Sequence, residues 1–195
     1  VKHNGEYVFL NGNEIGILLT GYSINKLAGQ NKITADSVIV KTLVTTSLIE
    51  IIARANKVKC IGDLLVGFKY IGAEMNKMYA ENTIAGFIMG TEESHGFLTG
   101  DYCRDKDAAC AAVRLAEFAA EMKDFGGTLV DALDQLYARY GYCLNYLTEV
   151  RMQGVAGMEK IGRMMDALRN EDIKAFGDFT VIDKTDREQG KPEPH

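Results

Sequence analysis

The stretch Gly90-Thr91-Glu92-Glu93-Ser94-His95-Gly96-Phe97 decides the fold prediction for this chain of 195 residues. It follows the short apolar run 84–89, and the charged run 104–107 comes shortly after it. A strand, a polar loop and then a helix is the order in which α/β proteins commonly place a binding site. The stretch is therefore predicted to be a ligand-binding loop after a buried strand.

The polar side chains of this loop suit the hydroxyl groups of a sugar. If the loop is extended, alternation places Glu92 and Ser94 on one side and Glu93 on the other. A carboxylate and a hydroxyl two residues apart can hold two adjacent sugar hydroxyls, with the carboxylate accepting both O–H bonds. We therefore expect Glu93, on the far side, to contribute little. A solvated acidic turn is the alternative, and the residues alone do not decide between the two.

The chain before the loop alternates between strand and helix patterns. The β-branched run 37–44 predicts a buried strand, with Lys41 placed to reach a cleft, and residues 57–61 predict another. Thr45, Thr46 or Ser47 is expected to cap the helix between these two strands. The apolar face of that helix is predicted to consist of Leu48, Ile51, Ile52 and Ala55. A strand, helix and strand in this order pair in parallel through a right-handed crossover.

Helix patterns surround this unit on both sides. A first helix is expected at about 13–27, and another runs from Gly67 to about residue 79. A glycine before a helix lets backbone N–H groups and Lys69 approach an anion, although Lys69 also fits a plain surface position. Later helices are predicted at 106–123, with Ala109, Ala112, Val113, Ala116 and Ala120 inward, and at 128–140, where Thr128 and Asp131 resemble a capping box. The pattern predicts an α/β fold with a mixed, mostly parallel sheet and helices on both faces.

The two ends of the chain have different patterns. Asn4-Gly5 predicts a hairpin within residues 1–10. Near the other end, strands are expected at 144–152 and 179–182, with an amphipathic helix at 155–168 whose methionine stripe suits a core. Residues 186–195 are polar and contain both prolines, which predicts disorder or added sequence.

Composition excludes several classes of function. The net charge of −5 and the pI of about 5.3 give no basic surface for nucleic acid. No apolar run reaches the length of a membrane span and no signal-peptide pattern is present, so we expect a cytoplasmic protein without a membrane partner. The four cysteines form no Cys-x-x-Cys pair and predict neither a zinc site nor a disulfide framework.

Three motifs in order, GFK at 67–69, GTEES at 90–94 and RDKD at 104–107, resemble the α-D-phosphohexomutases, the phosphoglucomutase and phosphomannomutase family. The resemblance runs from about residue 11 to residue 140. It implies the tail of a second domain at 1–10, the sugar-binding third domain at 11–141, the opening elements of a fourth domain at 142–185 and a tail at 186–195. His95 and Ala108 depart from the family pattern and leave the preferred hexose open.

The resemblance also implies roles for individual residues. The family's Gly-x-Glu-x-Ser loop corresponds to Gly90, Glu92 and Ser94 and holds hexose hydroxyls. Its Gly-Phe-Lys segment makes Gly67 and Lys69 ligands that line the cleft. In its charged segment Arg104 is a substrate ligand. Lys106 is a candidate catalytic residue of the full-length enzyme, acting by charge or by proton transfer, whereas helix capping by the charged run is the structural alternative.

The resemblance finally implies parts that this sequence does not hold. Family members interconvert hexose 1-phosphates and 6-phosphates through a bisphosphorylated intermediate, using a phosphoserine, a Mg²⁺ loop of spaced aspartates and a phosphate clamp. No Ser-His-Asn-Pro segment, aspartate loop or clamp is found here, and Asp101, Asp105 and Asp107 lack the setting of a magnesium site. We therefore expect a cofactor-free fragment that binds hexose phosphate, is inactive alone and works with the remaining domains of its parent enzyme. A stand-alone, non-catalytic module for sugar or sugar phosphate is the alternative.

Overall fold

The computed structural model describes residues 1–145, 150–184 and 186. The chain divides into two compact units, Val1–Asn145 and Tyr146–His195, and each is described by itself. The division into four segments at residues 10, 141 and 185 stays a prediction.

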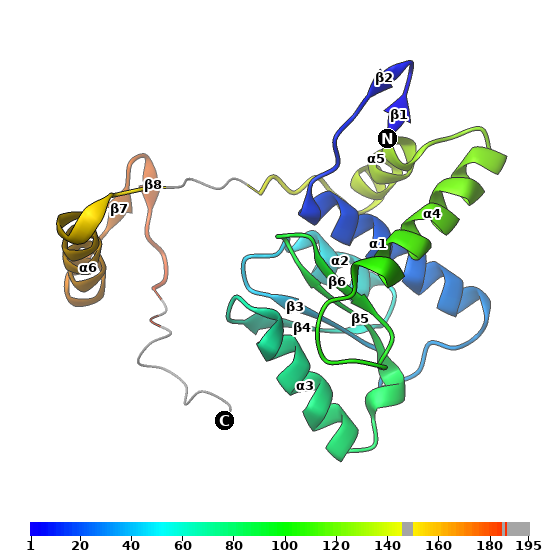
Figure 1. Cartoon of the computed structure of the whole chain (residues 1–195), viewed down its shortest axis with the longest axis horizontal. Coiled ribbons are helices and arrows are strands. Elements are labelled where there is room, and N and C mark those ends of the chain that lie inside the picture. The colour runs from blue at the N-terminus through cyan, green and yellow to red at the C-terminus, as the bar shows by residue number, and fades with distance from the viewer. Residues whose placement is uncertain (146–149, 185, 187–195) are drawn as a thin grey trace. The chain divides into compact units, whose positions relative to one another are not determined.

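A four-stranded sheet forms the centre of the first unit (Figure 1). Its strands are β3 (Val38–Thr42), β4 (Lys59–Leu64), β5 (Phe87–Glu92) and β6 (Gly96–Thr99), in the spatial order β4-β3-β5-β6. β3 pairs in parallel with β4 and β5, and β6 returns antiparallel to β5. The mixed, mostly parallel sheet predicted from the sequence is confirmed.

Helices cover both faces of this sheet, as predicted. Side chains alternate along β3, so Ile39 belongs to a core with α1, α2 and α5 on one face, while Val38 and Val40 pack with α3 on the other. Helix α4 packs beside β6 and α1. The helices of the unit are α1 (Gly12–Gly29), α2 (Leu48–Ala55), α3 (Phe68–Ala80), α4 (Ala108–Asp124) and α5 (Leu129–Tyr140).

Local capping chemistry fixes where two of these helices begin. At α1, the Asn11 side chain accepts a hydrogen bond from the Glu14 N–H, and the Glu14 carboxylate accepts one from the Asn11 N–H. Thr128 and Asp131 make the same reciprocal pair at α5, which confirms the capping box predicted there. Each such cap contributes about 1 kcal/mol to stability.

The predicted hairpin at the start of the chain is also confirmed. β1 (Lys2–His3) pairs antiparallel with β2 (Glu6–Tyr7), and both Asn4 and Gly5 have the positive φ that a tight two-residue turn requires. His3 Nδ1 lies 2.9 Å from Thr128 Oγ1, so the hairpin contacts the first turn of α5.

The predicted face of α2 is confirmed for Leu48 and Ile52 but is wrong for Ile51 and Ala55, and the predicted face of α4 is wrong. On α2 the buried residues are Leu48, Ile49, Ile52 and Ala53, whereas Ile51 is 39% exposed. Its N-cap Ser47 makes no side-chain cap bond, and Thr46 Oγ1 accepts the Leu48 N–H instead. On α4 a different set of residues faces the core, and Val113 of the predicted face is 67% exposed. Those packing residues are Ala111, Leu115, Phe118, Ala119 and Met122. Helix α4 leans on α1 and β6 at the sheet margin rather than lying flat on the sheet, which moves its buried stripe.

The strand that leads into the loop is shifted along the chain. Residues 84–89 were expected to be extended, but Ile84–Gly86 form a short 3₁₀ turn, and β5 then continues through Glu92. A Cβ at Gly86 would lie 2.2 Å from the Asp36 carbonyl oxygen, so glycine permits this close passage of the two chain segments.

Among its described residues, the second unit has one helix and a small hairpin. Helix α6 (Gly154–Asn170) confirms the predicted helix, and β7 (Ala175–Phe176) pairs with β8 (Phe179–Thr180), which is shorter than the predicted strand. A strand was expected at 144–152, but its described residues, 144–145 and 150–152, are not in a strand, and 146–149 lie outside the described residues. Nearly all of the predicted tail at 186–195 also lies outside the described residues. Met158, Met164 and Met165 are exposed rather than buried, because the described part of this unit offers no second layer for α6.

Candidate functional site

The candidate site lies where the parallel strands end. Loop 43–47 follows β3, loop 65–67 follows β4 and turn 93–95 follows β5, so all three leave the same edge of the sheet. Ligands of open α/β sheets commonly bind at this carboxyl edge. The strand order and direction thus gather the glycine-lysine segment and the acidic stretch, which are distant in sequence, at one place.

Glu92 is the last residue of β5 and is almost fully buried, with 2% of its surface exposed. Its Oε1 accepts a hydrogen bond of 3.0 Å from the Gly67 N–H, and its Oε2 lies 3.5 Å from Lys106 Nζ. Gly67 precedes α3, so the carboxylate stands at the positive end of that helix. Two residues that the sequence predicts as ligands, Glu92 and Gly67, therefore meet the candidate catalytic residue Lys106 in the folded chain.

The loop after Glu92 is a tight turn, not the extended segment that was expected. Glu93, Ser94 and His95 form a three-residue hairpin between β5 and β6, and Glu92 pairs with Gly96. His95 has φ of 64°, the left-handed conformation common at the third residue of such turns. Alternation therefore separates Glu92 from Glu93 but does not extend to Ser94, which is exposed at the tip.

Gly67 and Lys69 open helix α3 in the way an anion site requires. Gly67 has φ of 128°, which favours glycine, and no side chain caps the first turn. Lys69 is exposed, with its ammonium 4.8 Å from the centre of the Tyr70 ring. The first turn of α3 carries no acidic residue, so its N–H groups and Lys69 together present positive charge.

Arg104 and Lys106 differ in how firmly they are held. The Arg104 guanidinium donates to Asn76 Oδ1 at 2.8 Å and to the Asp101 carbonyl at 2.8 Å. Lys106 is 54% exposed and pairs with Glu92, so its ammonium can move toward a ligand. In this structure Arg104 braces the loop before α4, and its role as a ligand stays a prediction.

The charged run also caps α4. Asp107 is the N-cap, and its carboxylate accepts hydrogen bonds from the Tyr102 hydroxyl at 2.6 Å and the Ala109 N–H at 2.8 Å. The Tyr102 bond, followed by the Ala109 bond, lowers the pKa of Asp107. Asp107 therefore caps α4, and the side chain of the adjacent Lys106 takes no part in the cap.

Gly90 lies two residues before Glu92 on the same strand, under helix α3. A Cβ at this position would lie 2.7 Å from Ile71 Cγ2 and 3.3 Å from the Phe68 ring. The glycine lets α3 approach the sheet closely, which in turn brings the Gly67 N–H to Glu92. In this structure Gly90 faces the helix, and its predicted ligand role remains untested.

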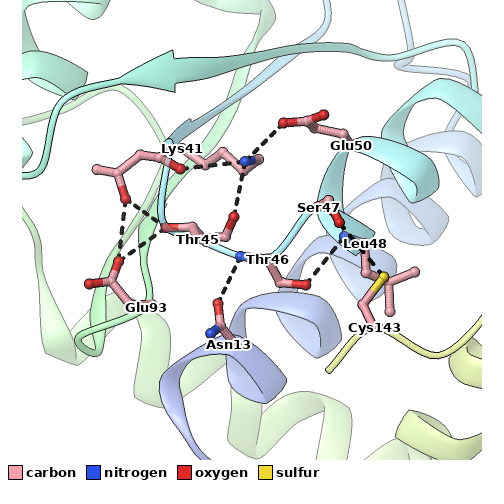
Figure 2. Close-up of polar contacts among 10 residues, drawn as sticks. Asn13, Lys41, Thr45, Thr46, Ser47, Leu48, Glu50, Glu93 and Cys143 are labelled. Carbon is pink, nitrogen blue, oxygen red and sulfur yellow. Dashed lines mark hydrogen bonds and ion pairs between the residues drawn. The ribbon is translucent and has the colours of Figure 1, made fainter. Parts of the chain in front are cut away.

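A second polar cluster on the other face was not predicted as part of the site (Figure 2). Glu93 Oε2 lies 3.3 Å from both Thr42 Oγ1 and Thr45 Oγ1. Behind them, Lys41 is 2% exposed, pairs with Glu50 at 2.9 Å and donates to the Thr45 carbonyl at 3.0 Å. Lys41 therefore holds the β3–α2 loop and does not reach a cleft. The sequence signal that could have revealed this cluster was two threonines, one near the end of the predicted strand 37–44 and one directly after it.

The described residues do not form a metal site. Within 1–145, 150–184 and 186, no three His, Cys, Asp or Glu side chains gather as metal binding would need. Asp105 accepts its neighbour's N–H and Asp107 caps α4, so neither carboxylate converges on a shared ion. The described residues therefore do not fit the Mg²⁺ that the family implies.

A surface hollow lies elsewhere on the first unit, along the edge strand β4. Its volume is about 380 Å³, and it is lined by Glu50, Arg54, Lys57, Val58, Lys59 and Cys60. Burial raises the pKa of the Cys60 thiol to about 11, so this group stays protonated at neutral pH. The hollow contains none of the predicted ligand residues and stands apart from the carboxyl edge.

The fold and this edge define an α/β domain that presents an acidic turn beside a cationic helix end. Comparison with known proteins is specific: residues 11–140 match the family described as phosphoglucomutase/phosphomannomutase, alpha/beta/alpha domain III. The chain belongs to this family, which confirms the resemblance found in the sequence. None of the helices among the described residues combines the length and the apolar character needed to cross a membrane.

Similar proteins agree with this assignment. Phosphoglucomutase from Staphylococcus epidermidis is 33% identical over 187 residues, covering 96% of this chain and 33% of that protein. Phosphoglucomutase from Staphylococcus aureus is 32% identical over 167 residues, covering 86% of this chain and 29% of that protein. A structure from Thermus thermophilus assigned as a phosphomannomutase has a TM-score of 0.52 at 22% identity, covering 69% of this chain and 26% of its own. The chain thus spans about a third of the length of the curated relatives it matches.

Proposed function

We propose that the carboxyl edge of this domain binds the hexose of a sugar phosphate, with Glu92 accepting hydrogen bonds from its hydroxyls. The observation that carries the proposal is the buried Glu92 carboxylate, held by the Gly67 N–H and Lys106 at the end of β5. Burial of a carboxylate is costly unless it has such partners, and a charged acceptor binds hydroxyls strongly. The half-exposed Lys106 ammonium is the partner that a sugar can displace.

The anionic part of the ligand has its own partners. Lys69, Lys106 and the uncapped first turn of α3 supply positive charge close to Glu92. Ser94, exposed at the tip of the turn, adds a hydroxyl contact in this proposal. A phosphorylated hexose offers hydroxyls and an anion together, which suits this combination better than a neutral sugar or inorganic phosphate.

We propose a role for this domain in a whole enzyme as well. There, the domain supplies the sugar-binding quarter of a mutase that interconverts hexose 1-phosphate and hexose 6-phosphate through a bisphosphorylated intermediate. Family membership and the third-domain match support the proposal. The chain alone is expected to show no turnover in a coupled assay, because its sequence holds no Ser-His-Asn-Pro nucleophile segment. Turnover by the pure chain would overturn that expectation.

Titration calorimetry or NMR on the chain tests the binding proposal. Glucose 1-phosphate and glucose 6-phosphate are titrated beside glucose and inorganic phosphate, and the hexose phosphates should bind more tightly than either part. A hydrogen bond to a charged group contributes about 1.5–3 kcal/mol, so Glu92→Ala should weaken binding about ten- to a hundredfold. Ser94→Ala should have a smaller effect. Glu81→Ala, at the exposed far end of α3, is the matched control. Equal affinity for inorganic phosphate and hexose phosphate would refute the proposal.

A further inference from the structure

The second glutamate of the turn is tied to a loop on the opposite face of the sheet from Glu92. Glu93 Oε2 lies 3.3 Å from the hydroxyl oxygens of Thr42 and Thr45, and those two oxygens lie 2.7 Å apart. Two hydroxyls have two hydrogens for these three contacts, so one threonine donates to the other while the second donates to the carboxylate. Such a chain strengthens each of its bonds, and the negative charge of Glu93 strengthens it further.

The loop that carries these hydroxyls is itself rigidly held. Lys41, buried and neutralised by Glu50, donates to the carbonyl of Thr45 at 3.0 Å. Asn13 Oδ1 accepts the Thr46 N–H at 2.9 Å, which ties the same loop to the first turn of α1 (Figure 2). The hydroxyl pair is therefore a fixed anchor.

The backbone of the turn is fixed from the other side by α1. A Cβ on Gly12 would lie 1.8 Å from the Glu93 carbonyl oxygen and 2.9 Å from the His95 nitrogen. Helix α1 and the turn are thus in direct backbone contact. The side chain of Glu93 adds a second attachment of the turn, to the β3–α2 loop.

We propose that Glu93 is a positioning residue for hexose binding: through Thr42 and Thr45 it fixes the turn that places Glu92 and Ser94. This inference rests on the function proposed above. It revises the sequence expectation that Glu93 contributes little, because a side chain that points away from the ligand still determines where its neighbours stand. Residues that act through a neighbour change affinity by about three- to thirtyfold.

The test uses the whole chain and four variants. Glu93→Ala should weaken binding of glucose 6-phosphate about three- to thirtyfold, and Glu93→Gln, which keeps one acceptor oxygen, should restore part of that loss. Thr45→Val removes a donor without changing the shape of the side chain, and it should reproduce much of the Glu93→Ala loss. Glu81→Ala is again the control.

A double-mutant cycle separates positioning from direct contact. If Glu93 acts through the hydroxyls, Glu93→Ala combined with Thr45→Val should cost little more than either change alone. Hydrogen exchange at the amides of residues 93–96 in the unliganded chain should become faster in Glu93→Ala. Additive losses would assign Glu93 to the ligand directly and overturn the inference. Faster exchange with unchanged affinity would make its role purely structural and would also overturn it.

Failure of the underlying function is distinguishable from failure of this inference. If the unmodified chain does not bind hexose phosphate, the proposed function falls, and the positioning role falls with it. If the unmodified chain binds and Glu93→Ala binds equally well, only the positioning role is refuted.

Discussion

The contact between α1 and the β5–β6 turn predicts opposite effects for two glycines in one helix. Gly12 is the first residue of α1, and a Cβ there would lie 1.8 Å from the Glu93 carbonyl oxygen. Gly29 is the last residue of the same helix, and a Cβ there would meet nothing within 4 Å. The atoms facing Gly12 belong to the backbone and cannot rotate away, so Gly12→Ala forces the turn and the helix apart.

At each glycine, the stability change depends on whether the helix preference for alanine exceeds the cost of the steric clash. Alanine is favoured over glycine in a helix by up to about 1 kcal/mol, and by less at its ends. Forcing a methyl group into packed atoms typically costs about 1–3 kcal/mol, and the short distance at Gly12 argues for the upper part of that range. Gly12→Ala should therefore lower the free energy of unfolding by about 2 kcal/mol. Gly29→Ala should raise it by about 0.5 kcal/mol.

Thermal and urea unfolding followed by circular dichroism provide the assay. For a chain of this size, 1 kcal/mol corresponds to about 2–4 °C in Tm. Gly12→Ala should thus melt about 4–8 °C lower and Gly29→Ala about 1–2 °C higher. If the two variants changed stability with the same sign and by the same amount, the close contact between α1 and the turn would be refuted. The turn that carries Glu93 would then not be fixed by the backbone of α1.

Three other predictions concern charged groups. Lys41→Met should lower the free energy of unfolding by about 1–2 kcal/mol in urea unfolding, because it removes the buried donor to the Thr45 carbonyl. The Glu50 side chain is 37% exposed and solvent replaces its lost partner, so adding Glu50→Gln should change little. Asp107 accepts hydrogen bonds from Tyr102 and Ala109, and these bonds, the Tyr102 bond first, hold its pKa in the folded chain below its pKa in the unfolded chain. The charged Asp107 therefore stabilises the folded chain above about pH 4, and this stabilisation is lost as the pH falls through the folded-state pKa. The stability difference between the unmodified chain and Asp107→Asn should therefore shrink on acidification from about pH 6 to about pH 3, and a constant difference would contradict the assignment. In a full-length enzyme, Lys106→Met should lower kcat with little change in hexose phosphate binding. Near-normal kcat in Lys106→Arg would then indicate that Lys106 acts by its charge, and a loss equal to that of Lys106→Met would indicate proton transfer. Unchanged kcat in both variants would exclude both roles.

Local patterns in the sequence predicted the helices of the first unit and its parallel strands, but they did not predict β6 and they placed a strand at 84–86, where the structure has a 3₁₀ turn. Alternating β-branched runs and helix periods predict the parallel β3–α2–β4 unit, and Thr128 with Asp131 marks the start of α5. These signals act within a few residues of one another. The faces of α2 and α4 depend on where each helix rests on the rest of the molecule, which a helical period does not specify.

The site could be predicted only in part for a similar reason. Glu92 and Gly67 were predicted as ligands and Lys106 as a candidate catalytic residue from motifs, and the strand order brings them together. The geometry of the turn was not predicted, because alternation holds only while the strand continues, and β5 ends at Glu92. The anchor made by Thr42 and Thr45 lies about fifty residues away from Glu93 in sequence and becomes visible only when β3 and β5 are paired.

The end of β5 explains why two adjacent glutamates can have different roles. Successive side chains of a strand point to opposite faces, so Glu92 meets the first turn of α3 while Glu93 meets the loop before α2. Gly67 follows β4 and Lys106 follows β6, whereas Thr42 ends β3 and Thr45 follows it, so each carboxylate finds its own partners. A shift of one residue in the register of β5 would exchange the two faces, placing Glu92 at the threonines and Glu93 at the helix. The register of this single strand therefore determines which carboxylate faces the ligand and which one holds the turn.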